Sequence, residues 1–176
     1  MRIASRTAGL ATGAVLTSAL LSAAATTPAT AYDPDPSYTV SYRDTDNCPC
    51  TLTDPIDNTY FKWDPNGYAT KVELRGTSTN PGSAPPYLGK VEFHPYDEKL
   101  WIYDTRNDGD TFYVRITYRT SVDKAVTLGP YSAGGTSATV DTKVYDLDIP
   151  EGEHLNIWVY DDANGNDQII TAIGTP

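Results

Sequence analysis

The feature that most constrains the fold is the absence of helical spacing of apolar residues after residue 31. Short runs rich in Val, Ile, Thr, Tyr, Phe and Trp recur instead, separated by clusters of Gly, Asn, Asp and Pro. Such runs are typical of β-strands, and the residues between them favour hairpins and tight corners. The sequence therefore predicts an all-β fold, an antiparallel β-sandwich of about 8–10 short strands, immunoglobulin-like or jelly-roll-like. The expected strands are 38–43, 59–63, 69–75, 89–94, 99–104, 111–120, 125–131, 143–149, 155–161 and 168–173.

Several of these runs alternate apolar and polar residues. Phe112 and Val114 share one face of their run, and polar residues occupy the other face. Runs 89–94 and 143–149 alternate in the same way, with Glu92 in a polar position. Alternation of this kind predicts antiparallel sheets with one face in the core and one face in water.

Residues 1–31 are typical of a cleaved secretory signal peptide. Arg2 and Arg6 form a short basic region, residues 8–25 are apolar or small, and Ala29-Thr30-Ala31 fits a signal peptidase site. The apolar stretch is rich in Ala and Thr and barely reaches the roughly 20 strongly apolar residues of a membrane-spanning helix. We therefore expect cleavage after Ala31, a secreted extracellular protein, and no membrane association after cleavage.

Length and position of the segments predict the domain organisation. Removal of 31 of the 176 residues leaves 145, which fits one domain of ordinary size. Residues 32–58 are expected to form an N-terminal segment with an edge strand and a turn at Cys48 and Cys50. Residues 59–176 are expected to form the sandwich, in a single domain with 32–58.

The chain is acidic, with 13 basic residues, 23 acidic residues and a net charge of −10. Because residues 1–31 hold two of the basic residues and no acidic one, the remaining chain carries a net charge of −12. That charge repels nucleic acid and anionic membranes, so neither is expected as a partner. The 19 aromatic residues, 13 of them Tyr, argue against disorder. We expect a monomer whose partner is an extracellular carbohydrate or protein.

Two cysteines, Cys48 and Cys50, are separated by Pro49. In an exported protein they are expected to form a local disulfide that stiffens one turn. An intermolecular bridge, or a redox or metal-binding role, is the alternative. Redox chemistry of the thioredoxin type uses two intervening residues, and a zinc site needs four ligands, to which only two histidines could add.

One motif occurs twice, as Trp101-Ile102-Tyr103-Asp104 followed by Asn107 and Asp110, and as Trp158-Val159-Tyr160-Asp161 followed by Asn164 and Asp167. In each copy aliphatic and aromatic residues alternate, so the aromatic rings face outward if the aliphatic side chains face the core. Outward Trp and Tyr rings can stack on sugar rings. The candidate ligand-binding residues are Trp101, Tyr103, Trp158 and Tyr160. The alternative is that these strands are buried on both faces, with the aromatic rings in the core or beneath the N-terminal segment.

The turn that follows each copy gathers oxygen donors, which are the ligands that Ca²⁺ prefers. The segment beginning at Asp162 imitates the first positions of an EF-hand loop, but Asp167 replaces the required Gly and Ile173 the final Glu. It is therefore not an EF-hand. Ordinary turn chemistry is the alternative, because Asp and Asn are common turn residues. The candidate Ca²⁺ ligands are Asp104, Asn107, Asp108, Asp110, Asp161, Asp162, Asn164, Asn166 and Asp167.

No familiar catalytic motif is present. The chain has no Gly-x-Ser-x-Gly, no His-Glu-x-x-His and no phosphate-binding loop, and its two histidines lie in no nucleophile or metalloprotease context. Paired carboxylates of the glycosidase type stay open, because 23 acidic residues provide many chance pairs. The sequence therefore favours a non-catalytic protein and names no catalytic residue.

The chain resembles the small secreted β-sandwich proteins of actinobacteria. The features that carry this resemblance are the Ala-rich signal, the segment from Lys99 to Gly109 and the turn Pro150-Glu151-Gly152. The resemblance implies a β-sandwich and export. Most members of that group have no assigned function, so it implies no site residues.

Three functions follow as hypotheses. The first is a secreted non-catalytic module that binds a neutral carbohydrate, with Ca²⁺ at the Asp/Asn loops. The second is a secreted protein-interaction or inhibitor module that presents the long irregular segment Gly76–Pro86 to a partner. The third is a hydrolase with an unfamiliar site.

Overall fold

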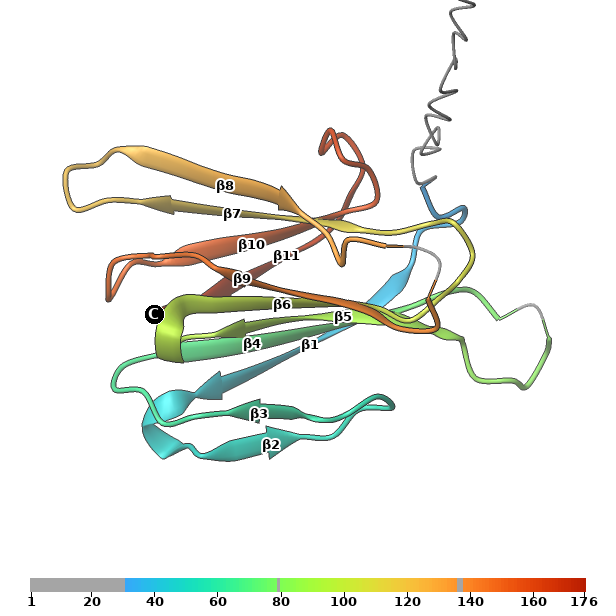
Figure 1. The fold of residues 1–176 in the computed structure, drawn as a ribbon, viewed down its shortest axis with the longest axis horizontal. Coiled ribbons are helices and arrows are strands. Elements are labelled where there is room, and N and C mark those ends of the chain that lie inside the picture. Colours follow the sequence, from blue (N-terminus) through green and yellow to red (C-terminus); the bar gives the residue numbers. More distant parts are fainter. Residues whose placement is uncertain (1–30, 79, 136–137) are drawn as a thin grey trace, which may run out of the picture.

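The computed structural model describes residues 31–78, 80–135 and 138–176. Two antiparallel sheets pack face to face, so the prediction of an all-β sandwich is confirmed (Figure 1). One sheet has the order β1-β4-β5-β6-β9, from β1 (Ser37–Asp44), β4 (Tyr68–Arg75), β5 (Tyr87–His94), β6 (Lys99–Asp104) and β9 (Asp141–Asp146). The other has the order β11-β10-β7-β8, from β11 (Gln168–Gly174), β10 (Leu155–Tyr160), β7 (Tyr113–Arg119) and β8 (Ala125–Tyr131).

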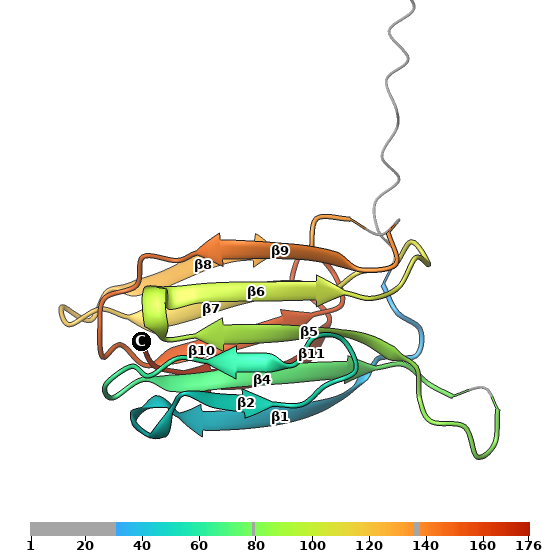
Figure 2. The same ribbon diagram turned by 60° about the horizontal axis from the view of Figure 1, so that its bottom comes forward.

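A third layer lies outside the sandwich. The short strands β2 (Cys50–Leu52) and β3 (Thr59–Phe61) form a separate two-stranded hairpin. Figures 1 and 2 show this hairpin against the outer face of the five-stranded sheet. The side chain of Phe61 is fully buried beneath it and packs in a small second core with Leu52 and Ala69. The hairpin is therefore a packed layer and not a free loop.

The hairpin is inserted between two paired strands. Asp44 at the end of β1 is the register partner of Tyr68 at the start of β4. Residues 45–67 thus leave the sheet and rejoin it at adjacent positions. This segment begins with the 3-10 helix η1 (Thr45–Asn47). Another 3-10 helix, η2 (Tyr96–Glu98), joins β5 to β6.

The core between the sheets follows the alternation seen in the sequence. Phe112, Val114 and Ile116 are fully buried, whereas their polar neighbours on β7 are partly exposed. Leu100 and Ile102 of β6 lie opposite them in the same cluster. Alternate side chains of both sheets therefore fill one apolar core, as a half-solvated antiparallel sheet requires.

Three expectations need correction. The polar face of β5 was expected to be solvated, but the Glu92 side chain is buried because the hairpin covers it. The list of expected strands lacked β2, which contains three residues without a recognisable pattern, whereas the two sandwich sheets have nine strands among the described residues, within the expected number. The expected strand 143–149 ends at Asp146, although Leu147 and Ile149 beyond it are still buried.

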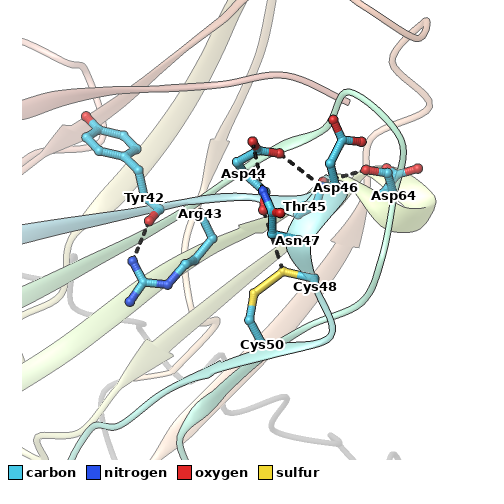
Figure 3. The surroundings of a disulfide bond; sticks show 9 residues. All are labelled: Tyr42, Arg43, Asp44, Thr45, Asp46, Asn47, Cys48, Cys50 and Asp64. Carbon is cyan, nitrogen blue, oxygen red and sulfur yellow. Dashed lines mark hydrogen bonds between the residues drawn. A yellow bond between two sulfur atoms is a disulfide. The ribbon is translucent and has the colours of Figure 1, made fainter.

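Cys48 and Cys50 are joined by a disulfide, the local pairing expected from their spacing. It lies at the start of the hairpin, directly after η1 (Figure 3). The Asp44 carboxylate accepts hydrogen bonds from the Asp46 N–H (3.0 Å) and from the Asn47 amide (3.2 Å). The Thr45 hydroxyl donates to the Asp64 carbonyl (2.7 Å). The disulfide and these bonds together fix the entry of the hairpin.

The signal peptide prediction falls almost entirely on residues 1–30, which lie outside the described residues. Among the described residues no helix is long and apolar enough to cross a membrane.

Candidate functional site

A pocket of about 380 Å³ lies between the hairpin and the outer face of the five-stranded sheet. This volume is within the range of about 300–1,000 Å³ that small-molecule sites occupy. The hairpin provides the roof, β5 and β6 provide the floor, and η2 closes one end. The pocket is lined by Asp57, Asn58, Tyr60, Phe61, Lys62, Glu92, His94, Pro95, Tyr96, Asp97, Lys99, Trp101 and Tyr103.

The floor carries two of the aromatic residues that the sequence singled out. Trp101 and Tyr103 alternate with the core residues of β6, so both rings lie on the outer face of the sheet. Their ring centroids are 6.2 Å apart and their planes differ by 12°. The Trp101 side chain is partly exposed, whereas Tyr103 is buried under the hairpin. Both hypotheses for these rings thus hold in part: they face outward, and the N-terminal segment covers one of them.

Beneath the roof lies a buried ion cluster centred on Lys90. Its ammonium contacts carboxylate oxygens of Asp57 (2.6 Å), Glu92 (2.7 Å) and Asp54 (2.9 Å). It also lies 4.5 Å from the centroid of the Tyr103 ring. Asp54 and Asp57 come from the hairpin, and Glu92 comes from β5. The lysine therefore ties the roof of the pocket to its floor.

The charges of this cluster are mutually stabilised. Burial opposes ionisation of Asp54, but hydrogen bonds from the Lys90 ammonium and the Ile56 N–H outweigh this effect. They lower the pKa of Asp54 to about 2. Burial likewise opposes ionisation of Glu92, yet hydrogen bonds from His94, Lys90 and Thr59 lower its pKa. The acids around Lys90 raise the lysine's pKa against the effect of burial. Asp54, Glu92 and Lys90 are therefore all charged at neutral pH.

The edge of the pocket combines rings with polar groups. His94 Nε2 lies 2.8 Å from the carboxylate of Glu92, and the imidazole centroid is 5.8 Å from Trp101. At η2 the Lys62 ammonium lies 4.1 Å from the centroid of the Tyr96 ring. The exposed Tyr60 of β3 forms part of the roof. The arrangement offers apolar ring faces with hydrogen-bonding groups around them.

Trp158 and Tyr160 lie elsewhere. They alternate with core residues of β10, so they face outward from the four-stranded sheet, on the opposite side of the sandwich. Their ring centroids are 6.4 Å apart at 15°, and the Trp158 indole N–H donates to the Thr117 hydroxyl (2.8 Å). The four candidate ligand residues therefore form two separate aromatic pairs, and one ligand site cannot contain them all.

The two candidate Ca²⁺ loops converge at the end of the sandwich where β6 and β10 finish. Both loops contribute acidic residues around Tyr32. Burial raises the pKa of the Tyr32 phenol, and Asp104, Asp108, Asp110 and Asp161 raise it further. Figure 1 shows the chain before β1 at this same end. Within the part of the chain that the structure describes, the repeated motif thus places its two copies in opposite sheets with their loops side by side.

In the second loop the carboxylates have different roles. The Asp162 carboxylate accepts hydrogen bonds from the backbone N–H groups of residues 164–167 at 2.6–2.8 Å, which fixes the loop. These bonds lower the pKa of Asp162, although desolvation acts in the opposite direction. Asp161 is buried, and its pKa rises to about 6 because of burial, although the nearby Tyr32 N–H opposes the rise. Asp167 is exposed, as are the side chains of Asn164 and Asn166. Asp162 therefore organises the turn.

The first loop is built differently. The buried Asp104 accepts a hydrogen bond from the Arg106 N–H (3.1 Å). The Arg106 guanidinium lies 3.6 Å from a carboxylate oxygen of Asp108, so this loop carries its own cation. Asp108 also accepts from the Asp110 N–H (3.2 Å), and Asn107 is exposed.

Carboxylates of two trios lie close enough together to share an ion. One is the trio of Asp54, Asp57 and Glu92, where the Lys90 ammonium already lies among the oxygens. The other is the trio of Asp35, Asp161 and Asp167. Asp35 precedes β1 and did not figure among the sequence-predicted ligands, because no local motif connects it with a loop more than 120 residues away.

Sequence reasoning also missed most of the pocket. His94 and Tyr96 reach Trp101 through the pairing of β5 with β6, whereas Asp57 and Tyr60 reach it only because the insertion folds over the sheet. One signal was present: Lys90 and Glu92 alternate on the polar face of one strand, as acidic and basic residues also do on β4. Such alternation favours ion pairs across neighbouring strands.

Comparisons with known proteins identified no relative. No family model, no curated protein and no solved structure matches the chain. The function is therefore argued from the site alone.

Proposed function

We propose that this protein is a secreted, monomeric and non-catalytic module that binds a neutral carbohydrate in the pocket beneath the β2–β3 hairpin. The observation that supports this most is the pair Trp101 and Tyr103, whose rings lie 6.2 Å apart in nearly parallel planes on the pocket floor. The C–H faces of sugar rings pack on such surfaces, and their hydroxyls need polar partners at the rim. His94, Lys62 and Lys99 provide those partners.

The charge arrangement favours a neutral ligand. Three carboxylates near the floor share the single Lys90 ammonium, so the negative charge that remains opposes an anionic ligand, whereas Lys62 and Lys99 at the rim oppose a cationic one. A pocket of about 380 Å³ fits a short sugar segment and not an extended crystalline surface. We therefore expect soluble oligosaccharides to bind better than insoluble polymers.

Binding is also better supported than hydrolysis. A glycosidase needs one carboxylic acid with a raised pKa that can donate a proton. Glu92 instead has a lowered pKa, and its oxygens accept hydrogen bonds from Thr59, Lys90 and His94. Asp57 contacts the same lysine. Glu92 is therefore held in the charged state and is suited to positioning the pocket walls.

Substitution of one tryptophan tests the site. Trp101→Ala should weaken binding of an oligosaccharide identified from a glycan panel by about 10- to 100-fold, because stacked aromatic anchors carry about 1–3 kcal/mol. Isothermal titration calorimetry gives the affinities. Trp158→Ala is the matched control, because it removes the same ring from the opposite face. Equal losses in both variants, or an unaffected Trp101→Ala protein, would rule out this pocket.

A second candidate is supported by the segment between β4 and β5. The Gly76 N–H donates to the Pro86 carbonyl (2.9 Å), which closes the base of the loop, and residues 80–85 are all exposed. Such a loop could present an extended segment to a protein partner. Replacing residues 80–85 by two glycines should leave glycan binding intact under the first proposal. A protein that binds no glycan, but whose binding to a protein partner is lost with this replacement, would instead favour the second.

A further inference from the structure

We propose that Asp35, Asp161 and Asp167 form a binding site for Ca²⁺ at the end of the sandwich. This inference does not rest on carbohydrate binding, because the pocket lies on the outer face of the five-stranded sheet and these aspartates lie where β10 ends. It joins the chain before β1 to the loop between β10 and β11.

The side chain of Asp161 is buried without compensation of its charge among the described residues. Its exposed fraction is 1%, and neither carboxylate oxygen has a hydrogen-bond partner of ordinary geometry among the described residues. A buried ionised carboxylate is costly unless a cation or hydrogen bonds compensate it. A metal ion would provide that compensation.

The spacing of the three carboxylates fits a single Ca²⁺ ion. One oxygen from each of Asp35, Asp161 and Asp167 lies within 4.8 Å of the others. Ca²⁺ binds oxygens at about 2.3–2.6 Å, so two oxygens on opposite sides of one ion lie about 4.8 Å apart. One ion can therefore contact all three carboxylates. Asp35 and Asp167 are exposed, which leaves room for water at the other coordination positions.

The loop is organised before any ion binds. The Asp161 N–H donates to the Asp167 carbonyl (2.8 Å), which closes the loop at its base. Asp162 binds the backbone N–H groups of the loop and so holds its shape. Two of the three proposed ligands are thus fixed relative to each other, which lowers the entropic cost of binding.

The chemistry of the ligands selects the class of ion. All three are carboxylates, which suit hard cations such as Ca²⁺ and not zinc or copper. In the trio of Asp54, Asp57 and Glu92, the Lys90 ammonium occupies the place that a metal ion would take. No described Lys or Arg forms an ion pair with Asp35, Asp161 or Asp167: Arg106 pairs with Asp108, and Arg115 donates to the carbonyls of Ala163 and Asn164.

Another cation could compensate Asp161. If the chain is cleaved after Ala31, the new α-ammonium of Tyr32 would lie near Asp161, since the Tyr32 N–H is close to its carboxylate. One monovalent ammonium would still leave two of the three negative charges unbalanced. The geometry of the whole trio therefore favours a divalent ion.

The test is thermal unfolding of the purified protein during titration with Ca²⁺ up to about 10 mM, above the dissociation constants of weak extracellular sites. We expect the melting temperature to rise by roughly 5 °C at about ten times the dissociation constant. Asp161→Asn should abolish the rise. Asp35→Asn and Asp167→Asn change exposed residues and keep the test valid if Asp161→Asn does not fold; each should weaken Ca²⁺ binding at least about tenfold.

Asp33→Asn is the matched control, because it removes one exposed negative charge from the same segment and should keep the full shift. The proposal is overturned if Ca²⁺ causes no shift, or if Asp33→Asn loses as much of it as Asp35→Asn. The proposal is also overturned if Ca²⁺ has no effect on the melting temperature, but a protein with extra residues before Tyr32 melts at a lower temperature. That result would show that the α-ammonium of Tyr32 compensates the charge of Asp161.

Discussion

At the scale of single residues, Asp104 is a buried carboxylate without full compensation. It ends β6 with its side chain buried, and one of its oxygens has no hydrogen-bond partner among the described residues. Burial raises its pKa to about 6, although the Arg106 N–H and the Thr111 hydroxyl oppose the rise. The folded protein therefore binds the carboxyl proton of Asp104 more tightly than the unfolded chain does. Stability falls as the pH rises from about 4 to about 6, and it stays lowered above pH 6 because the buried carboxylate is then charged.

Asp104→Asn should therefore stabilise the protein at alkaline pH. At pH 8, without divalent cations, we expect the free energy of unfolding to increase by about 2 kcal/mol. The gain should shrink as the pH falls through about 6 towards 4, where the wild-type carboxyl becomes protonated. Urea unfolding at pH 8 and pH 4 measures both values. Asp123→Asn on the exposed β7–β8 turn is the control, and a gain that is independent of pH would contradict the assignment.

At the scale of secondary structure elements, the β2–β3 hairpin is held by polar contacts as much as by apolar ones. Its turn supplies Asp54 and Asp57 to Lys90, and Thr59 donates to Glu92 (2.6 Å). Lys71 donates to the Thr53 carbonyl (3.0 Å). Removing one partner of such a network leaves the others buried and unpaired.

Lys90→Met tests this coupling, because methionine keeps the length of the side chain without its charge. We expect the free energy of unfolding to fall by about 3–5 kcal/mol, since Asp54 and Glu92 lose their cation. The hairpin amides should also exchange faster with solvent. Lys124→Met on the surface is the control. A loss below about 1 kcal/mol in Lys90→Met would show that the cluster does not anchor the hairpin.

The elements of the sandwich could be predicted wherever one face is apolar and the other polar. Phe112, Val114 and Ile116 are buried as expected, because alternation specifies both the strand and its inner face. The hairpin could not be predicted in the same way. β2 is too short to show a period, and Glu92 occupies a position typical of a solvated face until the insertion covers it.

At the scale of the whole molecule, the sequence identified parts of the site but not their assembly. Trp101 and Tyr103 were named because their motif recurs, yet the copy at Trp158 belongs to the other sheet. In the pocket, the rings near Trp101 come from its own sheet, whereas the roof comes from the insertion. Local patterns do not encode which distant segments meet, so neither Tyr60 nor Asp35 could be assigned.

The N-terminal segment makes the export proposal testable. Tyr32 packs against the main core, so packed structure begins directly after the expected cleavage position. We expect the protein purified from the culture medium of an exporting host to begin at Tyr32, as intact mass and N-terminal sequencing would show. Protein that begins beyond Asp35 would lack a proposed Ca²⁺ ligand, and protein that retains residues 1–31 would contradict cleavage.

The pairing of Asp44 with Tyr68 has an evolutionary consequence. An insertion whose ends are adjacent in a sheet can lengthen, shorten or exchange its sequence without moving the strands on either side. The sheet face beneath it carries Lys71, Lys90 and Glu92, residues that water would solvate readily if the insertion were absent. Descendants of one ancestral sandwich could thus acquire new ligand preferences by replacing residues 45–67, and protein engineers can use the same boundaries for grafting.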